Sequence, residues 1–442
     1  MKKFSILMGI MIFLTACMSN TPQPNPISDT DQVSTIVAGT LAAYPPTEIP
    51  ATPTLPDVDS LSINGQLQGK LAFIRNNNLW ISINGVETQL TNDADPSFTG
   101  SPNLWYSNPQ ISPDGTKIAF LKMADTDART LMVSDIDGKN IRQLDNAVAW
   151  VIPVMEWTND SQKIYYPISN GFDVTTGLET MTVKSIDPTT GEFQDYGQYG
   201  VRAGCGGGSS DPADAISSLE NLEPFGGVVF ELSPQNNYIV HTVSCTGSGL
   251  GVLDLSTRQD RALAEQARGA VISPDGSKIA AAFNNSVVIL NINNGGIEYT
   301  LPTSETPQAL LWDADGKEIL YSTSILANTL TLDDKVTLDL FGGSSISYNL
   351  NISTLWMVSL ESGQSTKIIE IEAHNLKPVF TNGQKVLFVI VENANKLFDY
   401  VTQGNRENLA EYYPTANILE VDLVNLISNP ITSNTKQASF HK

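Results

Sequence analysis

The chain has 442 residues, of which 47 are Asp or Glu and 25 are Lys or Arg, so its formal net charge is −22 at pH 7. So acidic a chain is repelled by the phosphates of nucleic acids and by anionic lipid headgroups, which excludes both as direct binding surfaces. The acidic residues instead predict a well-solvated surface, on a chain longer than a typical single domain.

The N-terminus predicts export. Lys2 and Lys3 precede an apolar run over residues 6–14, which is too short to span a bilayer and has the length of a signal-peptide core. The run ends in Leu-Thr-Ala-Cys17, which resembles a bacterial lipobox. We therefore expect residues 1–16 to be removed and Cys17 to carry lipid. An ordinary signal peptide with an accidental cysteine and an uncleaved anchor are the alternatives.

Residues 17–57 form a Pro- and Thr-rich stalk in this interpretation. Apolar residues at helical spacing within 29–41 fit a short helix, and a disordered segment fits the same sequence equally well. The proline-rich stretch 45–57 predicts an extended linker of roughly 35 Å. The stalk would lift a folded domain off a membrane that the chain contacts only through its lipid.

A repeat then runs through residues 58–442. An apolar strand, a polar tight turn and a second apolar strand recur at 109–120, 154–166, 230–240, 270–281 and 310–321, and in shortened form at 378–388. The Ser-Pro-Asp-Gly turn suits a hairpin, because Pro presets φ, Asp caps the turn and Gly accepts a positive φ. With one or two further strands after each hairpin and an incomplete copy at 70–93, the repeats predict an all-β, seven-bladed propeller of four-stranded blades.

The repeat resembles that of TolB-like propellers, which are relatives of WD-repeat proteins. The resemblance is carried by the segment from Ser112 to Phe120 and by the Asp-Ile-Asp-Gly turn from Asp135 to Gly138. It implies the fold and a range of roles: scaffold, sensor ectodomain or substrate gate. The front copy lacks its innermost strand, and either residues 60–65 or residues 436–441 could supply it and close the ring.

Two cysteines remain after Cys17. Cys205 and Cys245 lie in connections that a propeller places on the same face, and an exported chain favours a disulfide over a metal site or a reactive pair. We expect these two residues to be bridged.

No catalytic motif is found, and no cofactor or metal site is expected. His241, His374 and His441 are the only histidines, and we assign them structural or surface roles. The glycine-rich run 204–210 lacks the lysine and spacing of a phosphate-binding loop. Adjacent acids, namely Asp125 with Asp127, Asp135 with Asp137 and Asp333 with Asp334, are expected by chance in so acidic a chain. Calcium binding by such acids is left open.

Long segments are expected on one face of the ring. Strand direction alternates across a blade, so links between blades share a face with connections between second and third strands. The segments 94–108, 199–226, 322–353 and 392–416 are all of these two kinds, and repeat proteins place recognition loops in this way. Their aromatic residues are the candidate binding residues: Trp105, Tyr106, Phe225, Tyr348, Tyr412 and Tyr413.

These features predict a monomeric, lipid-anchored extracytoplasmic module that binds a protein or glycan of the cell envelope, at the outer leaflet of the cell membrane or in an outer membrane. The alternative is a glycan hydrolase or lyase built on a propeller. That alternative requires two carboxylates close together on the ring axis.

We predict that the mature chain begins at a lipidated Cys17. Labelling cells with a clickable fatty acid is expected to mark the wild-type chain and to leave the Cys17→Ser variant unmarked, because only the thiol accepts the diacylglycerol. Equal labelling of the two chains would contradict the anchor.

Overall fold

The computed structural model describes residues 62–63, 66–95, 104–124, 129–146, 148–149, 154–202, 229–244, 248–332, 346–405, 415–426, 428–433, 435 and 438–441. The chain divides into two units, Met1–Pro56 and Asp57–Lys442, and every described residue belongs to the second. Within the described residues the elements are β-strands and one α-helix, α4 (Asn395–Thr402).

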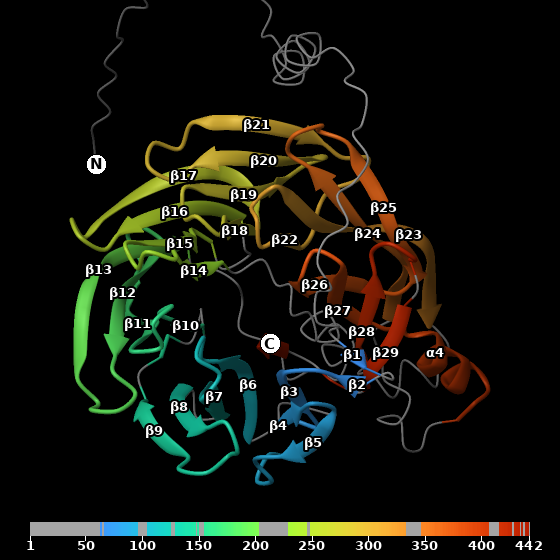
Figure 1. Ribbon diagram of the computed structural model, residues 1–442, viewed down its shortest axis with the longest axis horizontal. Helices are drawn as coiled ribbons and strands as arrows, with labels where there is room; N and C mark the ends of the chain where they lie inside the picture. Colours follow the sequence, from blue (N-terminus) through green and yellow to red (C-terminus); the bar gives the residue numbers. More distant parts are fainter. Residues whose placement is uncertain are drawn as a thin grey trace, which may run out of the picture. The chain divides into compact units, whose positions relative to one another are not determined.

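Among the described residues, seven antiparallel four-stranded sheets follow one another around a ring with β9, β13 and β21 at its rim (Figure 1). Blade 1 consists of β30 (Ala438–His441), β3 (Lys70–Arg75), β4 (Asn78–Ile83) and β5 (Val86–Gln89). Blade 2 consists of β6 (Leu104–Ile111), β7 (Lys117–Ala124), β8 (Arg129–Asp135) and β9 (Arg142–Asp145). Blade 3 consists of β10 (Glu156–Trp157), β11 (Ile164–Asp173), β12 (Leu178–Ile186) and β13 (Phe193–Arg202).

Blade 4 consists of β14 (Phe230–Leu232), β15 (Tyr238–Thr242), β16 (Ser248–Asp254) and β17 (Gln259–Arg268). Blade 5 consists of β18 (Ala270–Ile272), β19 (Lys278–Phe283), β20 (Ser286–Asn291) and β21 (Ile297–Pro302). Blade 6 consists of β22 (Leu310–Trp312), β23 (Glu318–Leu332), β24 (Ile346–Ser359) and β25 (Ser365–Glu372). Blade 7 consists of β26 (Asn375–Thr381), β27 (Lys385–Val391), β28 (Ala416–Asp422) and β29 (Ser428–Thr432). The predicted seven-bladed propeller is confirmed.

The repeated turn forms as its sequence predicts. In blade 2 the Ser112 hydroxyl donates to Asp114 Oδ1 at 2.6 Å and accepts from the Lys117 amide at 3.0 Å. Gly115 has φ +68°, a conformation that a side chain would strain, and its amide donates to the Ser112 carbonyl at 2.7 Å. The turn in blade 5 repeats these contacts with Ser273, Asp275 and Gly276.

Apolar clusters fill the interfaces between neighbouring blades. Between blades 2 and 3, for example, Ala119 and Leu121 of β7 pack against Trp157, Ile164 and Tyr166 of the next blade. The tryptophans on the innermost strands add a directional contact. Trp157 Nε1 donates to the Gln110 carbonyl at 3.2 Å, and Trp312 Nε1 donates to the Val271 carbonyl at 3.0 Å. Each such bond satisfies a buried indole while tying one blade to the preceding one.

The tail of the chain closes the ring. β30 pairs antiparallel with β3, from Lys70 opposite His441 to Phe73 opposite Ala438. Of the two segments considered for this role, the tail is therefore the right one, and the front segment instead forms a separate two-stranded hairpin, β1 (Ser62–Ile63) with β2 (Gln66–Leu67). Gly69 has φ +114°, and a Cβ there would lie 2.7 Å from the His441 carbonyl oxygen, so glycine lets the tail pass.

Arg75 fastens blade 1 to blade 7 at this closure. Its guanidinium donates to Glu87 Oε2 at 2.6 Å within blade 1 and to Thr432 Oγ1 at 2.6 Å and the Ser433 carbonyl at 3.0 Å in blade 7. The same group lies 4.9 Å from the ring centre of Phe73. The planar guanidinium carries several donors in fixed positions, so one side chain bonds three acceptors where the first and last blades meet.

Candidate functional site

The antiparallel blades give the ring two chemically different faces. We call the surface that holds the connections between second and third strands and the links between blades the insertion face. The surface that holds the turns between first and second strands and between third and fourth strands is the turn face. Strand alternation puts these two groups of connections on opposite sides.

On the turn face, hydrogen bonds connect neighbouring blades. Lys70 Nζ donates to the Gly115 carbonyl at 2.9 Å, the Asp114 amide donates to Ser161 Oγ at 2.9 Å, and Gln235 Nε2 donates to the Asp275 carbonyl at 2.7 Å. The first contact joins the start of β3 in blade 1 to the turn of blade 2, and the other two join a turn to the turn of the next blade. Polar groups satisfied in this way offer little to a partner.

The insertion face carries the long elements. Residues 322–353 were expected to be a loop, but the expectation is wrong for most of the segment, because β23 and β24 stay paired from Glu318–Ser359 to Leu332–Ile346. β25 stops opposite Ile352, so the outer part of the hairpin has two strands only. In blade 7, the corresponding connection contains α4. Residues 94–108 are likewise not all loop, since β6 begins at Leu104.

Exposed apolar side chains stand on this face. At the end of the β11–β12 hairpin, Phe172 is 51% exposed and Val174 is 83% exposed. On β23, Ile325 and Leu326 are 44% and 60% exposed. Each pair interrupts a polar stretch of the sequence, residues 169–177 and 322–329. Neither pair was predicted, because only the aromatic residues of four long segments were considered, and these segments do not include Phe172.

The candidate aromatic residues lie in different environments. Tyr106 is buried, donates its hydroxyl to Asp93 Oδ1 at 2.7 Å and packs edge-on against Phe120. Burial, followed by the Asp93 hydrogen bond and charge, raises its pKa. Trp105 is partly buried against the cluster between blades 2 and 3, with the Arg129 guanidinium 5.4 Å from its ring centre. Tyr348 belongs to β24, and Phe225, Tyr412 and Tyr413 lie outside the described residues.

The axis of the ring holds a second group of residues, which the strand register identifies. In blades 2 to 6 the residue two positions before the turn Ser, Thr or Asp holds an equivalent place on the innermost strand, as the pairs Gln110–Ala119 and Val271–Ala280 show. A bulge in β26 displaces the equivalent Val379 of blade 7. Taken in blade order, the seven axial positions are Ser439, Gln110, Glu156, Glu231, Val271, Leu311 and Val379. These equivalent positions are polar in blades 1–4 and apolar in blades 5–7.

The innermost strands of blades 3, 4 and 7 carry three ionisable residues, Glu156, Glu231 and Lys377. Gln110 Nε2 donates to the Met155 carbonyl at 2.6 Å and to Glu156 Oε1 at 3.2 Å. Glu231 Oε2 accepts from the Ile272 amide at 2.9 Å. Lys377, two residues before the bulge of β26, acts electrostatically on both carboxylates. We call Glu156, Glu231 and Lys377 the axial cluster.

Burial dominates the electrostatics of the axial cluster. Desolvation raises the pKa of Glu156 to about 7, and Gln110 and Lys377 offset only part of that effect. Desolvation and then the Glu156 charge raise the pKa of Glu231 to about 8. Desolvation likewise lowers the pKa of Lys377 against the attraction of the two acids. Only acids adjacent along the chain drew notice in the sequence, so this pair was missed, because Glu156 and Glu231 lie in different repeats. Both occur two residues before the turn Ser or Thr.

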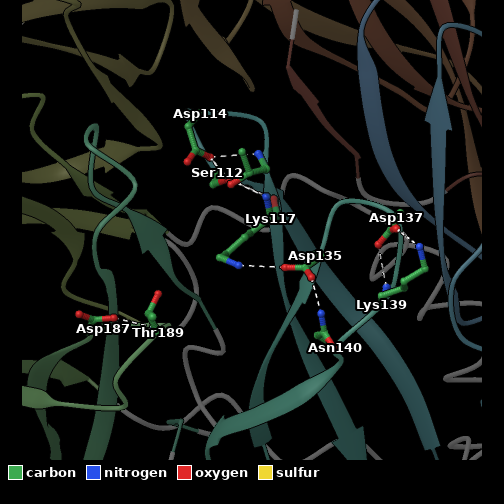
Figure 2. A network of polar contacts seen from close by, with 10 residues as sticks. Ser112, Asp114, Lys117, Asp135, Asp137, Lys139, Asn140, Asp187 and Thr189 are labelled. Carbon is green, nitrogen blue, oxygen red and sulfur yellow. Dashed lines mark hydrogen bonds and ion pairs between the residues drawn. The ribbon is translucent and has the colours of Figure 1, made fainter.

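The acids that the sequence singled out as neighbours form turns. Figure 2 shows Asp135 between Lys117 and Asn140, whose nitrogens lie 2.9 and 2.6 Å from its carboxylate oxygens, and Asp137 turned toward Lys139. The hydrogen bond from Asn140, followed by that from Lys117, lowers the pKa of Asp135. Both residues thus belong to the Asp-Ile-Asp-Gly turn that the repeat contains, where the Gly138 amide donates to the Asp135 carbonyl at 2.9 Å. Asp125, Asp127, Asp333 and Asp334 and the run 204–210 lie outside the described residues.

The histidines lie apart from one another. His241 is fully buried, with Nε2 2.9 Å from Asp260 Oδ1, Nδ1 3.0 Å from the Thr242 carbonyl and its ring against Tyr199. His374 is buried at the start of blade 7. Burial and then the Lys70 charge lower the pKa of His441 on the closing strand. Among the described residues, no three His, Cys, Asp or Glu side chains gather as metal ligands, and no helix has the length and hydropathy to cross a membrane.

Comparison with known proteins finds matches of low sequence identity. The family described as the dipeptidyl peptidase IV N-terminal region matches residues 50–172, and no curated protein matches the chain. TolB from Acinetobacter baumannii is 13% identical over 85% of this chain and 68% of its own, with a TM-score of 0.41. An oligogalacturonate lyase from Vibrio parahaemolyticus is 10% identical over 83% and 86%, with a TM-score of 0.46.

A prolyl endopeptidase structure is 11% identical with a TM-score of 0.48, and this chain, matched over 84% of its length, spans half of that protein. At such identities the likeness concerns the fold alone.

The segments that precede the two remaining cysteines lie side by side. The Arg202 amide donates to the Val243 carbonyl at 2.9 Å, and Arg202 forms a parallel bridge with Ser244. Cys205 and Cys245, which follow shortly after, are outside the described residues together with Cys17. The neighbouring backbones favour the expected disulfide, which requires Cα atoms within about 7 Å.

We predict a bridge between Cys205 and Cys245 that contributes about 3–4 kcal/mol by restricting the unfolded chain. Thiol titration of the unfolded, unreduced protein is expected to find no free thiol, because Cys17 is occupied by lipid. Two reactive thiols per chain would refute the bridge.

Proposed function

We propose that this propeller is a lipid-anchored, extracytoplasmic binding module that holds a protein partner of the cell envelope against its insertion face. The lipobox-like N-terminus and the stalk support the location. The propeller supplies a rigid frame that presents long elements on one side.

The observation that carries the proposal is the placement of apolar surface on the extended hairpins. Phe172 and Val174 end one hairpin, and Ile325 and Leu326 lie along the other, where β23 and β24 leave the four-stranded blade. Exposed apolar side chains on projecting elements are typical of protein interfaces, whereas glycan recognition relies on polar groups around stacked aromatic rings. A protein partner is therefore the better match.

The hydrolase or lyase alternative requires two carboxylates close together on the ring axis, and the axial cluster has two acids on neighbouring innermost strands, Glu156 and Glu231. Both are engaged by the protein itself, Glu156 by Gln110 and Glu231 by the Ile272 amide. Binding on the insertion face explains more of the structure, because it accounts for the elongated strands as well as for their exposed side chains.

The test compares the two faces. The full chain carrying Phe172→Ser, Val174→Ser, Ile325→Ser and Leu326→Ser is expressed in its native cells and cross-linked, and the envelope proteins attached to it are quantified by mass spectrometry. We expect the partner captured by the wild type to fall at least about tenfold, because one or two lost apolar anchors reduce affinity by that factor or more.

Val424 and Leu426 provide the matched control. They are 80% and 50% exposed in the turn between the third and fourth strands of blade 7, hence on the turn face. Val424→Ser with Leu426→Ser should leave capture unchanged. Capture that survives the insertion-face changes but is lost in the control would assign the partner to the turn face and overturn the proposal.

A further inference from the structure

The hairpin of β23 and β24 projects beyond both of its neighbours in blade 6. The pairing of β22 with β23 stops at Tyr321 and the pairing of β25 with β24 stops at Ile352, whereas β23 and β24 stay paired out to Leu332 and Ile346. Among the described residues, the projecting backbone therefore has two edges without a neighbouring strand. An edge of this kind can pair with another extended chain.

The hydrogen bonds of Ser322 show which backbone groups face the open edge of β23. The Ser322 amide donates to the Ala309 carbonyl at 3.0 Å, and the Ser322 carbonyl accepts from the Gln308 amide at 2.9 Å, both on the β22 side. Along an antiparallel strand, successive residues direct their amide and carbonyl to opposite neighbours. The backbone groups of Ser324 and Leu326 therefore point to the same side as those of Ser322, past the end of the β22 pairing.

The opposite edge, on β24, is closed by a side chain where β25 ends. The Asn351 amide donates to Asn393 Oδ1 at 3.1 Å, and the Asn351 carbonyl accepts from Asn393 Nδ2 at 2.9 Å. The side-chain amide of Asn393 thus takes the place of a strand residue. Asn351 lies opposite Leu326, and because its backbone groups turn away from β23, those of Leu326 turn away from β24. This agrees with the direction derived from Ser322.

The open stretch of β23 is short. A register shift between Leu326 and Asn328 interrupts the ladder, and beyond it the Thr329 amide is bonded to Asn328 Oδ1 at 2.8 Å. The stretch that can take a strand therefore runs from Ser324 to Leu326, and the amides and carbonyls of these two residues are its hydrogen-bonding groups. Its apolar side chains, Ile325 and Leu326, are both exposed.

This edge lacks the protection that the other edges have. The outermost strand of every blade carries a charged residue or a proline, which hinders pairing with a foreign strand. In blade order these residues are Glu87, Arg142, Asp195, Asp260, Glu298, Lys367 and Pro430. Charged residues make up 16% of the chain, yet β23 after Glu318 and all of β24 contain neither a charge nor a proline.

We propose that the edge of β23 from Ser324 to Leu326 binds an extended, uncharged segment of the partner protein as an added strand that continues the line of β22. This inference rests on the proposed function and names how the partner is held. The backbone groups of Ser324 and Leu326 fix the segment, and Ile325 and Leu326, on opposite faces of the hairpin, contact its side chains. A second copy of this chain fits less well, because two chains of net charge −22 repel each other.

The first measurement is amide hydrogen exchange of the full chain, resolved to single residues. In the free protein, the amides of Ser324 and Leu326 should exchange at least about tenfold faster than those of Thr323 and Ile325, which face β24. Equal protection of these four amides would mean that the edge is already covered, and it would overturn the inference.

The second measurement repeats the cross-linking in native cells with Leu326→Pro. Proline removes an amide that takes no part in the pairing with β24 and keeps an apolar side chain, so the hairpin stays paired. Capture of the partner should fall at least about tenfold, because the added strand loses a hydrogen bond and its fit. Leu326→Val keeps the amide, and Thr329→Pro removes an amide already bonded to Asn328, so both controls should capture the partner like the wild type.

The third measurement needs no variant. The partner peptide that cross-links to β23 identifies the bound segment, which is synthesised and added to the wild-type full chain. It should slow exchange of the Ser324 and Leu326 amides at least about tenfold. Unchanged exchange would overturn the inference, and so would a cross-linked peptide from this chain itself, which would identify a second copy as the occupant.

The variants separate this inference from the proposed function. Capture that survives Leu326→Pro but is lost in the variant with four serine substitutions would show that the partner contacts side chains only. That result refutes the added strand and leaves the proposed function standing. Capture that survives both variants would refute the proposed function as well.

Discussion

The pairing of the last strand with the first blade is the constraint on which the structure depends. A four-stranded blade with an open inner edge exposes unpaired amides and carbonyls, and β3 would be such an edge without β30. The tail also brings Ser439 to the axis, where its hydroxyl accepts from the Ile111 amide of blade 2 at 3.1 Å. Residues separated by more than three hundred positions thereby become neighbours, and the seven axial positions, the inter-blade clusters and the two faces acquire fixed places.

Strand alternation creates the two faces. Their chemistry depends on which polar groups are hydrogen-bonded within the protein on each face. On the turn face, serine, aspartate and glycine bond to their own turn and to the next one, as in the Asp114–Ser161 contact. On the insertion face, β23 and β24 extend beyond the four-stranded blade, and exposed apolar side chains lie on the projecting hairpins, whereas those of the turn face, such as Val86 and Val424, lie in or beside short turns. The ion pair Lys117–Asp135 lies on the turn face, and the residues of the axial cluster are partly exposed on the innermost strands.

The sequence was sufficient to predict the blades because each repeat contains its own turn chemistry, from Ser112 to Gly115 and again from Ser273 to Gly276. The sequence did not decide which segment closes the ring, because residues 60–65 and the tail carry equally weak strand signals. Only Gly69 indicates that another part of the backbone approaches closely. Tyr106 illustrates a second limit. Its strand, β6, begins at Leu104, and strand alternation therefore places the Tyr106 side chain against Phe120. The position of the strand boundary thus decides whether Tyr106 is buried. Glu156 and Glu231 illustrate a third limit, because they hold the same position in two successive repeats and are far apart along the chain.

Ring closure by the tail is the central claim, and shortening the chain tests it most directly. Ending the chain after Thr435 removes β30 and leaves every other strand intact. The unfolding midpoint of the shortened chain should fall by at least about 5–10 °C, as expected for the loss of a few kcal/mol in a domain of this size, and the chain should self-associate through β3. Moving residues 436–441 to a position just before Gly69, joined by a four-residue turn, should restore both properties. A shortened chain that remains monomeric and unfolds at the wild-type temperature would contradict the account.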